Sequence, residues 1–191
     1  MTAACSFSWM ATRRVISVAL LTLVGVLGCA SVPLSTMVKM SQFGPEEFVE
    51  LKPEDIRAKV TVEEAVGLKP EQTILEVTLA SPNGQLMKTF NFELISETPR
   101  TEERWLRAPL HWIDYEMKLT DEGESAFKSF QQFAANDPEL NSFAISVGAK
   151  VKNPPPEGEI MVMSIALKLY QQEAYMPLFE KAEIKMGKTE I

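Results

Sequence analysis

A histidine and two carboxylates within one short segment are the residues of this chain best placed for acid–base chemistry. His111 is the only histidine, and Asp114 and Glu116 follow it within five positions. Proton transfer would also require a nucleophile or a substrate pocket within hydrogen-bond reach, and the sequence contains no Gly-x-Ser-x-Gly elbow. Asp114 and Glu116 alternate along a predicted strand, on its solvated side. We therefore expect a structural role for these residues and predict that the chain is not an enzyme.

Two thioethers form a second candidate site. Met161 and Met163 are two positions apart, so a strand would place both sulfur atoms on one side, where they could bind Cu(I). The same side continues with large aliphatic residues at 165, 167 and 169, as is typical of a strand that faces a protein core. The pattern favours core packing, and we predict no metal and no cofactor.

The thiol of Cys29 is the third chemically active group, and it lies at the end of an apolar stretch. Arg13 and Arg14 precede the uncharged residues 15–28, which are too few to cross a bilayer as a permanent helix. The stretch ends in Val26-Leu27-Gly28-Cys29. This motif resembles the lipobox of bacterial lipoproteins, whose signal peptide is removed immediately before the cysteine. The alternatives are an ordinary secretory signal that ends near a cysteine, and an uncleaved anchor helix.

The resemblance implies a lipid anchor on Cys29, which would become the first residue of the mature chain. In that family the thiol carries diacylglycerol and the new amine receives a further acyl chain such as palmitate. Ala30 and Ser31 follow the cysteine, and the absence of an aspartate there favours the periplasmic face of the outer membrane. The predicted organisation is a signal peptide at 1–28, with translation starting at Met10, a lipidated tether with a short helix at 29–55, and one domain at 56–191.

Charge and cysteine content exclude several classes of function. The formal net charge is −7, and no cluster of Lys and Arg is present, which argues against nucleic acid as a partner. With Cys29 acylated and Cys5 preceding the predicted start, no free thiol remains for a disulfide, a thiolate metal site or a cysteine nucleophile. A single histidine also excludes every multi-histidine metal site.

Alternation of apolar and polar residues predicts a mainly β domain of about seven strands. They are expected at 56–63, 73–81, 86–96, from Pro109 to Leu119, and at 141–152, 159–170 and 181–186. A short helix is predicted from Pro45, and one longer helix near 121–136, capped by Thr120 or Asp121. Residues 67–72 and 97–107 are predicted to be loops, with Trp105 and Leu106 packed against the domain. Residues 30–42 are predicted to form a short leader.

These elements predict an antiparallel sheet system covered by the longer helix. A sandwich-like arrangement is favoured, and a single curved sheet packed on the helix is the alternative. An Asn-Gly turn at residues 83 and 84 predicts a tight hairpin between the second and third strands.

The predicted function is a non-catalytic binding or scaffolding module that is anchored in the envelope and contacts an envelope protein. Trp112, on the polar side of its strand, and the tip formed by Pro154, Pro155 and Pro156 are the candidate partner contacts. Packing of Trp112 under the preceding loop is an equal alternative. The alternative is a carrier of an apolar ligand or acyl chain in a pocket lined by Phe and Met. The phenylalanines considered for that pocket, or else for the core, are Phe90, Phe92, Phe127, Phe130, Phe133 and Phe143.

Overall fold

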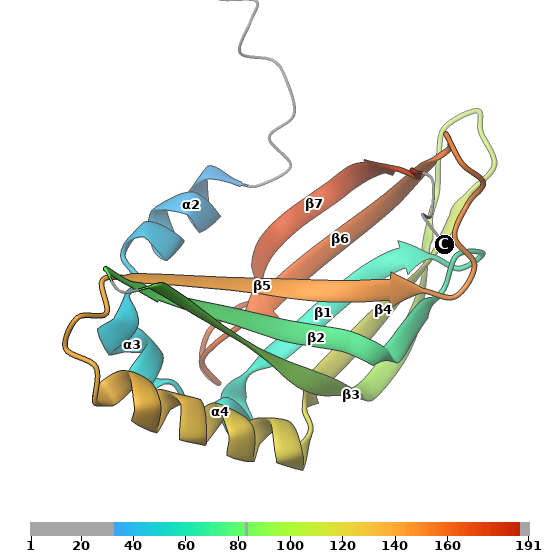
Figure 1. Cartoon of the computed structure of the whole chain (residues 1–191). Coiled ribbons are helices and arrows are strands. Elements are labelled where there is room, and N and C mark those ends of the chain that lie inside the picture. The colour runs from blue at the N-terminus through green and yellow to red at the C-terminus, as the bar shows by residue number, and fades with distance from the viewer. Residues whose placement is uncertain (1–32, 83, 188–191) are drawn as a thin grey trace, which may run out of the picture. The chain divides into compact units, whose positions relative to one another are not determined.

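A single seven-stranded antiparallel sheet forms the domain. The computed structural model describes residues 33–82 and 84–187. The strands are β1 (Arg57–Glu63), β2 (Leu68–Ser81), β3 (Gly84–Glu102), β4 (Leu110–Leu119), β5 (Ser142–Val151), β6 (Ile160–Lys168) and β7 (Met176–Lys185), in the spatial order β5-β2-β3-β4-β1-β6-β7. Figure 1 shows that the sheet is strongly curled into a half-barrel. The mainly β prediction is confirmed, and the curved sheet is the arrangement that the chain adopts.

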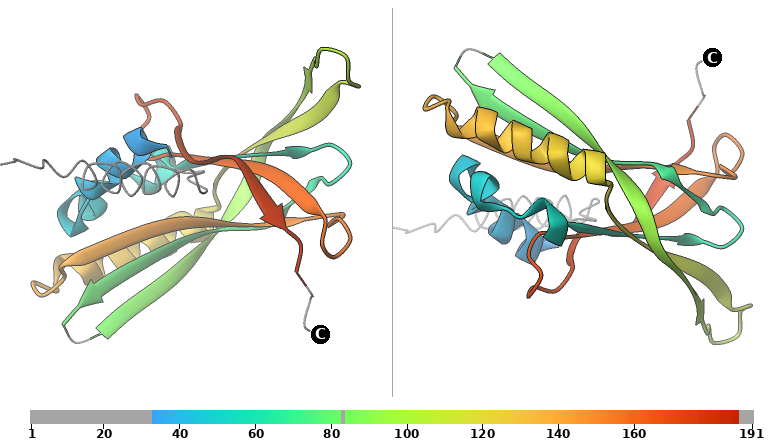
Figure 2. Two further views of the ribbon diagram at one scale, coloured as in Figure 1. Left: turned by 90° about the horizontal axis from the view of Figure 1, so that it is seen from above. Right: turned by 90° about the horizontal axis from the view of Figure 1, so that it is seen from below.

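Within the described residues, three helices and one 3-10 turn lie beside the sheet. Their bounds are α2 (Leu34–Ser41), α3 (Pro45–Glu50), η2 (Pro53–Asp55) and α4 (Asp121–Ala135). Helix α4 packs against β3 and α3, and Figure 2 shows it running along one side of the curled sheet. The segment predicted to be a leader therefore contains helix α2, and the predicted short helix and long helix both form.

Aromatic rings join α4 to α3 and to the sheet. The Phe127 ring lies 5.2 Å from that of Phe48 and 5.0 Å from that of Phe90, and all three side chains are buried. Phe130 is also buried against the same two rings. Burial of an apolar side chain of this size stabilises a fold by about 1.5–3 kcal/mol, so this cluster fixes the helices on the concave side of the sheet.

The predicted hairpin between β2 and β3 is confirmed. Ser81 and Gly84 are paired at its end, and Gly84 has φ of 143°, a conformation that side-chain-bearing residues rarely adopt. Asn83, the other residue of the predicted turn, lies outside the described residues.

The prediction of a loop at 97–107 is wrong for its first part, because β3 continues to Glu102 and pairs with β4. The loop was predicted from the charged residues of this segment and from Pro99, yet Pro99 lies opposite Ile113 in the register. Strand β2 pairs with β3 only up to Asn91, so the other side of β3 has no neighbouring strand at Pro99. At such a sheet edge the missing N–H of proline costs no ladder hydrogen bond.

Bulges explain two other boundary errors. Leu68 and Lys69 already pair with β5, and the register shifts before Ile74, so the predicted loop at 67–72 is part of β2. Strand β7 begins at Met176 rather than at residue 181, with register shifts near Phe179 and a φ of 47° at Lys181. A bulge moves side chains to the other face and so breaks the alternation from which strands are predicted.

Loss of the α4 cap is expected to be measurable. The Thr120 hydroxyl accepts a hydrogen bond from the Gly123 N–H at 2.9 Å, which confirms Thr120 as the N-cap. Thr120→Ala should lower the free energy of unfolding by about 1 kcal/mol in urea titrations, since an N–H at the helix start loses its acceptor. Ser125→Ala, which removes an exposed hydroxyl in the same helix, should change it little. Equal effects of both changes would contradict the cap assignment.

Candidate functional site: an apolar groove between the edge strands

The two edges of the sheet, β5 and β7, face one another across the open seam of the half-barrel. At one end of this seam the N-terminal helices bridge the two edges. The Thr36 hydroxyl of α2 donates to the Pro177 carbonyl of β7 at 2.6 Å, and Lys39 forms an ion pair with Glu173. The Phe43 ring lies 5.0 Å from that of Phe143 on β5. The segment from α2 to α3 therefore occupies this end of the seam.

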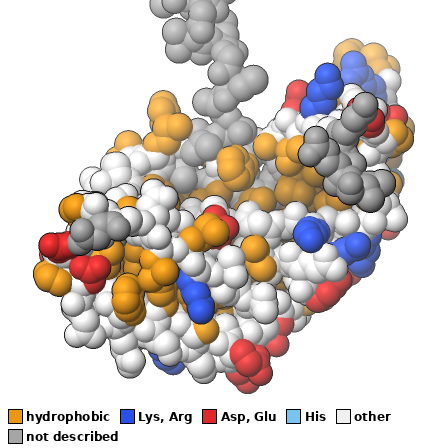
Figure 3. Space-filling view, in the orientation of Figure 1, with side chains coloured by type: hydrophobic (Ala, Val, Ile, Leu, Met, Phe, Trp, Pro, Cys, Tyr) orange, Lys and Arg blue, Asp and Glu red, His pale blue; other side chains and the backbone are white. Residues whose placement is uncertain are grey.

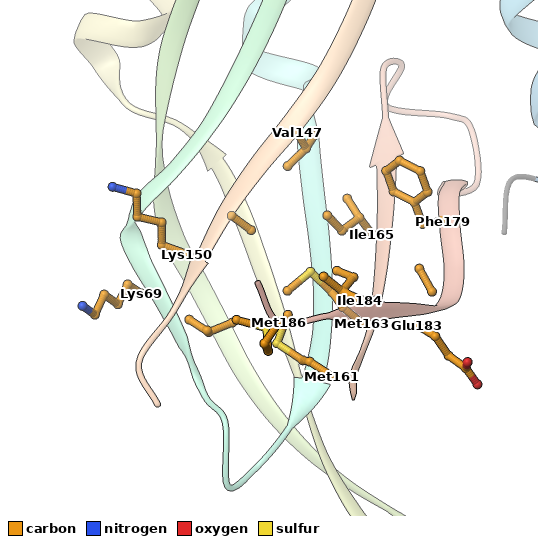
Figure 4. Close-up of a pocket in the computed structure, with 13 residues that line it drawn as sticks. Lys69, Val147, Lys150, Met161, Met163, Ile165, Phe179, Glu183, Ile184 and Met186 are labelled. Carbon is orange, nitrogen blue, oxygen red and sulfur yellow. The ribbon is translucent and has the colours of Figure 1, made fainter. Parts of the chain in front are cut away.

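The other end of the seam is an open groove of about 710 Å³. Most of its lining residues are apolar, namely Val147, Ala149 and Val151 of β5, Met161, Met163 and Ile165 of β6, and Phe179, Ala182, Ile184 and Met186 on or after β7. Figure 4 shows the methionine side chains gathered together with Ile184, and Figure 3 shows hydrophobic side chains in a hollow of this face. The groove has the composition of a site for an apolar ligand.

The methionines contribute both to the core and to the groove. Met161 and Met163 are nearly buried, and their face of β6 continues into the buried Leu167, as the core prediction requires. Met186 faces them from beyond β7. Thioether side chains have several rotatable bonds and a polarizable sulfur, so they adapt to the shape of an apolar ligand.

Charged residues occur at the rim of the groove rather than inside it. Lys69 and Lys150 are paired in the register of β2 and β5, and Glu183 lies on the opposite side. In Figure 4 both amino groups point away from the methionines, so it is the aliphatic parts of the two lysines that border the groove.

The loop with three consecutive prolines follows directly from the groove. It connects Val151 to β6, and Pro154 and Pro156 are exposed while Pro155 is half-buried. Hydrogen bonds fix both of its ends. The Asn153 N–H donates to the Val66 carbonyl at 2.9 Å, and the Gly158 N–H donates to the Met186 carbonyl at 3.0 Å. The three prolines therefore lie in a loop whose two ends are held in place by hydrogen bonds.

Trp112, the other predicted partner contact, is 4% exposed. It lies opposite Arg100 of β3 and Glu63 of β1, on the side of the sheet away from the core. An ion pair across this side joins Lys181 to Glu102, and the hydrogen bond from Lys181 lowers the pKa of the Glu102 carboxyl. Trp112 is thus a packed side chain, which is the second of the two roles that its sequence position left open.

No known family matches this chain. Comparison with protein-family models, with curated proteins and with solved structures finds nothing similar, so the site has to be interpreted from its own geometry. Within the described residues, no helix is long and apolar enough to cross a membrane.

The structure does not bring the acid–base candidates together. His111 is exposed, with its Nδ1 3.3 Å from the Thr101 hydroxyl. Asp114 accepts a hydrogen bond from the Thr61 hydroxyl at 2.6 Å, and Glu116 accepts one from the phenol of Tyr175. Burial and this hydrogen bond raise the pKa of Tyr175. Each group therefore has its own structural partner. No cluster of three or more His, Cys, Asp or Glu that could hold a metal occurs in 33–82 and 84–187.

The residues that the sequence interpretation missed lie at the tip of the β3–β4 hairpin. Trp105 and Leu106 were expected to pack against the domain, but they are 91% and 83% exposed. The prediction is wrong because the strands extend far enough to carry this tip, residues 103–109, away from the core. A sequence signal did exist, since these two apolar residues stand between Arg104 and Arg107 in a turn.

Proposed function

We propose that the protein is a non-catalytic carrier that binds a single apolar chain, such as an acyl chain, in the groove between β5 and β7. The observation that supports this proposal is an open, mainly apolar groove of about 710 Å³ at one end of the seam. Ligand sites of proteins commonly enclose about 300–1,000 Å³ and are lined mostly by hydrophobic side chains.

The free energy of binding would come from burial of methylene groups. Each buried methylene contributes about 0.8 kcal/mol, so a chain segment of about ten carbons would gain roughly 8 kcal/mol before the cost of ordering. Since the two lysine amino groups at the rim point outward, a charged head group of the ligand would lie at the solvent boundary rather than inside.

The second part of the proposal concerns the location of the protein in the cell. We propose that Cys29 is lipidated and holds the domain at the periplasmic face of a bacterial outer membrane. The support is the order of residues Val26-Leu27-Gly28-Cys29 after a short apolar stretch. A carrier of acyl chains anchored there would work beside a source of its ligand.

A scaffolding role is the second candidate function, and the proline loop favours it. Pro154 and Pro156 are exposed on a segment whose ends are fixed. Consecutive prolines adopt an extended conformation before binding, so an envelope protein could recognise them at a small cost in conformational entropy.

Filling the groove tests the carrier function. In the chain that begins at residue 29, with Cys29→Ser, Ala149→Trp should weaken binding of the fluorescent fatty acid cis-parinaric acid at least about tenfold, because the indole would occupy the ligand's space. The matched control is Ala144→Trp on the same strand, since Ala144 is exposed and does not line the groove. Ala182→Trp would fill the groove from β7, and it replaces Ala149→Trp in the binding test if that variant is unstable.

Fluorescence titration gives the affinity, and urea unfolding shows that each variant is folded. Equal affinities of the Ala149→Trp and Ala144→Trp proteins would refute the groove as the binding site. Absence of binding to the parent protein would refute the carrier function, and capture of an envelope protein that requires Pro154 to Pro156 would then support the scaffold.

A further inference from the structure

Among the described residues, the large apolar side chains with the highest exposure lie at the tip of the β3–β4 hairpin. Trp105 and Leu106 are 91% and 83% exposed, and they belong neither to the core nor to the lining of the groove. Large apolar residues gathered at one protruding point are uncommon on a surface that faces only water. The tip therefore points to a contact that the domain makes with something else.

The backbone of the tip holds these side chains outward. Leu106 has φ of 60°, a left-handed conformation that a bulky residue seldom adopts. The Arg104 guanidinium donates to the Ala108 carbonyl at 2.9 Å and closes the turn. Strained backbone of this kind persists where the surroundings hold it in place, and it often marks a functional site.

The charge around the tip suits an anionic surface. The tip carries two arginines, Arg104 and Arg107, against one carboxylate, Glu103, and neither arginine makes an ion pair with any described residue. The tip is therefore net positive, whereas the chain as a whole carries −7. Trp combines an apolar ring with a polar N–H and favours the interface between lipid and water. Arginines beside it are attracted to anionic lipid head groups.

Helix α2 has an apolar surface of its own. Its Thr36 is buried against β7, while Leu34 and Val38 are 78% and 60% exposed, the reverse of the pattern of an ordinary surface helix. Cys29 precedes Leu34 by five residues, which an extended chain spans in about 18 Å. An acyl chain on Cys29 would therefore hold this face of α2 close to the bilayer.

We propose that the Trp105–Leu106 tip inserts into the surface of an anionic phospholipid bilayer, with the outward face of α2 as a second point of contact. Figure 1 shows the hairpin rising at the upper right and α2 at the upper left, while α4 runs along the lower edge of the domain. The inference rests on the proposed lipid anchor only for bringing the domain to the membrane.

Trp105 is itself the probe that tests this inference. The full chain is reconstituted into vesicles of phosphatidylethanolamine and phosphatidylglycerol, with and without bromine atoms on the acyl chains. It carries Trp9→Phe, so that any unprocessed N-terminal segment adds no tryptophan signal. The fluorescence of the same protein with Trp105→Phe comes from the buried Trp112. Subtracting it from the fluorescence of the first protein gives the emission of Trp105. Substituting Trp112 is thereby avoided.

We expect the emission of Trp105 to shift to shorter wavelength and its intensity to fall about twofold with brominated lipid, because the ring would lie at the head-group level. Arg107→Glu should reduce this quenching. The matched control places tryptophan on α4 as Phe133→Trp in the Trp105→Phe protein, since Phe133 is exposed and α4 lies at the lower edge of the view, away from the hairpin tip. This control should not be quenched.

Three results would overturn the proposal. The first is a Trp105 emission that is unchanged by vesicles. The second is a shift without quenching by bromine, which would mean that protein, such as a second copy, covers the tip. The third is equal quenching of the α4 control. Labelling with palmitate reports the anchor separately, so a chain without acyl groups would refute that proposal while Trp105 quenching still decides this one.

Discussion

Replacing Cys29 by serine is expected to reduce incorporation of labelled palmitate to background and to remove the protein from the outer-membrane fraction. The hydroxyl is not a substitute for the thiol that receives diacylglycerol in bacterial lipoproteins, which the motif Val26-Leu27-Gly28-Cys29 resembles. Two or more acyl chains hold a protein at a membrane almost permanently, so their loss should change the localisation completely. Metabolic labelling and density-gradient fractionation of bacterial cells measure both effects.

Cys5→Ser is the matched control, because Cys5 is the only other cysteine. It should change neither labelling nor fractionation, since translation is predicted to start at Met10. Unchanged processing and localisation of the Cys29→Ser protein would contradict the proposed lipid anchor and membrane location.

Gln131→Leu is expected to lower the free energy of unfolding by about 2–3 kcal/mol, the cost of leaving buried carbonyl groups without a donor. The Gln131 amide donates to the carbonyls of Phe48 and Leu51 at 2.8 Å and to that of Val49 at 3.2 Å. These carbonyls lie at the end of α3, where a helix leaves its last carbonyls without internal donors. That of Phe48 also accepts the Leu51 N–H at 3.3 Å, so the change deprives chiefly the carbonyls of Val49 and Leu51. Urea titration followed by circular dichroism measures the change.

Gln132→Leu makes the same chemical change one residue along α4, where the side chain is exposed. Its effect should lie within about 0.5 kcal/mol. Similar losses in both variants would show that the amide of Gln131 does not stabilise α3.

Local patterns were sufficient for much of the fold. The Asn-Gly turn, the alternation in β5 and β6, and the Thr120 cap of α4 all act within a few residues of sequence, so they could be predicted. The choice between a sandwich and a half-barrel could not, because it depends on which strands pair across long distances. Strand β1, for example, pairs with β4 and β6 rather than with the next strand in the chain.

The sequence left open the presence of an apolar pocket, but it did not predict which residues line the groove. Met161 and Met163 were predicted to face the core, and the alternative of a pocket lined by Phe and Met was open. Of the phenylalanines considered, however, none lines the groove. Phe90, Phe127 and Phe130 instead pack with Phe48 where α4 meets α3 and the sheet. Phe179, which does line it, lies at a bulge that disrupts the alternation. The structural role of Gln131 could not be predicted from the sequence, since the carbonyls to which it donates lie about eighty residues away.

The irregular course of β7 has a consequence for crowding under the proposed lipid anchor. Proteins tethered to a membrane surface are confined to two dimensions, and exposed strand edges then meet often. Pro177 lacks an N–H to donate, and the bulge at Lys181 interrupts the ladder in the middle of the edge. Both features oppose the addition of a foreign strand. Crowded copies should therefore remain separate instead of polymerising through β7.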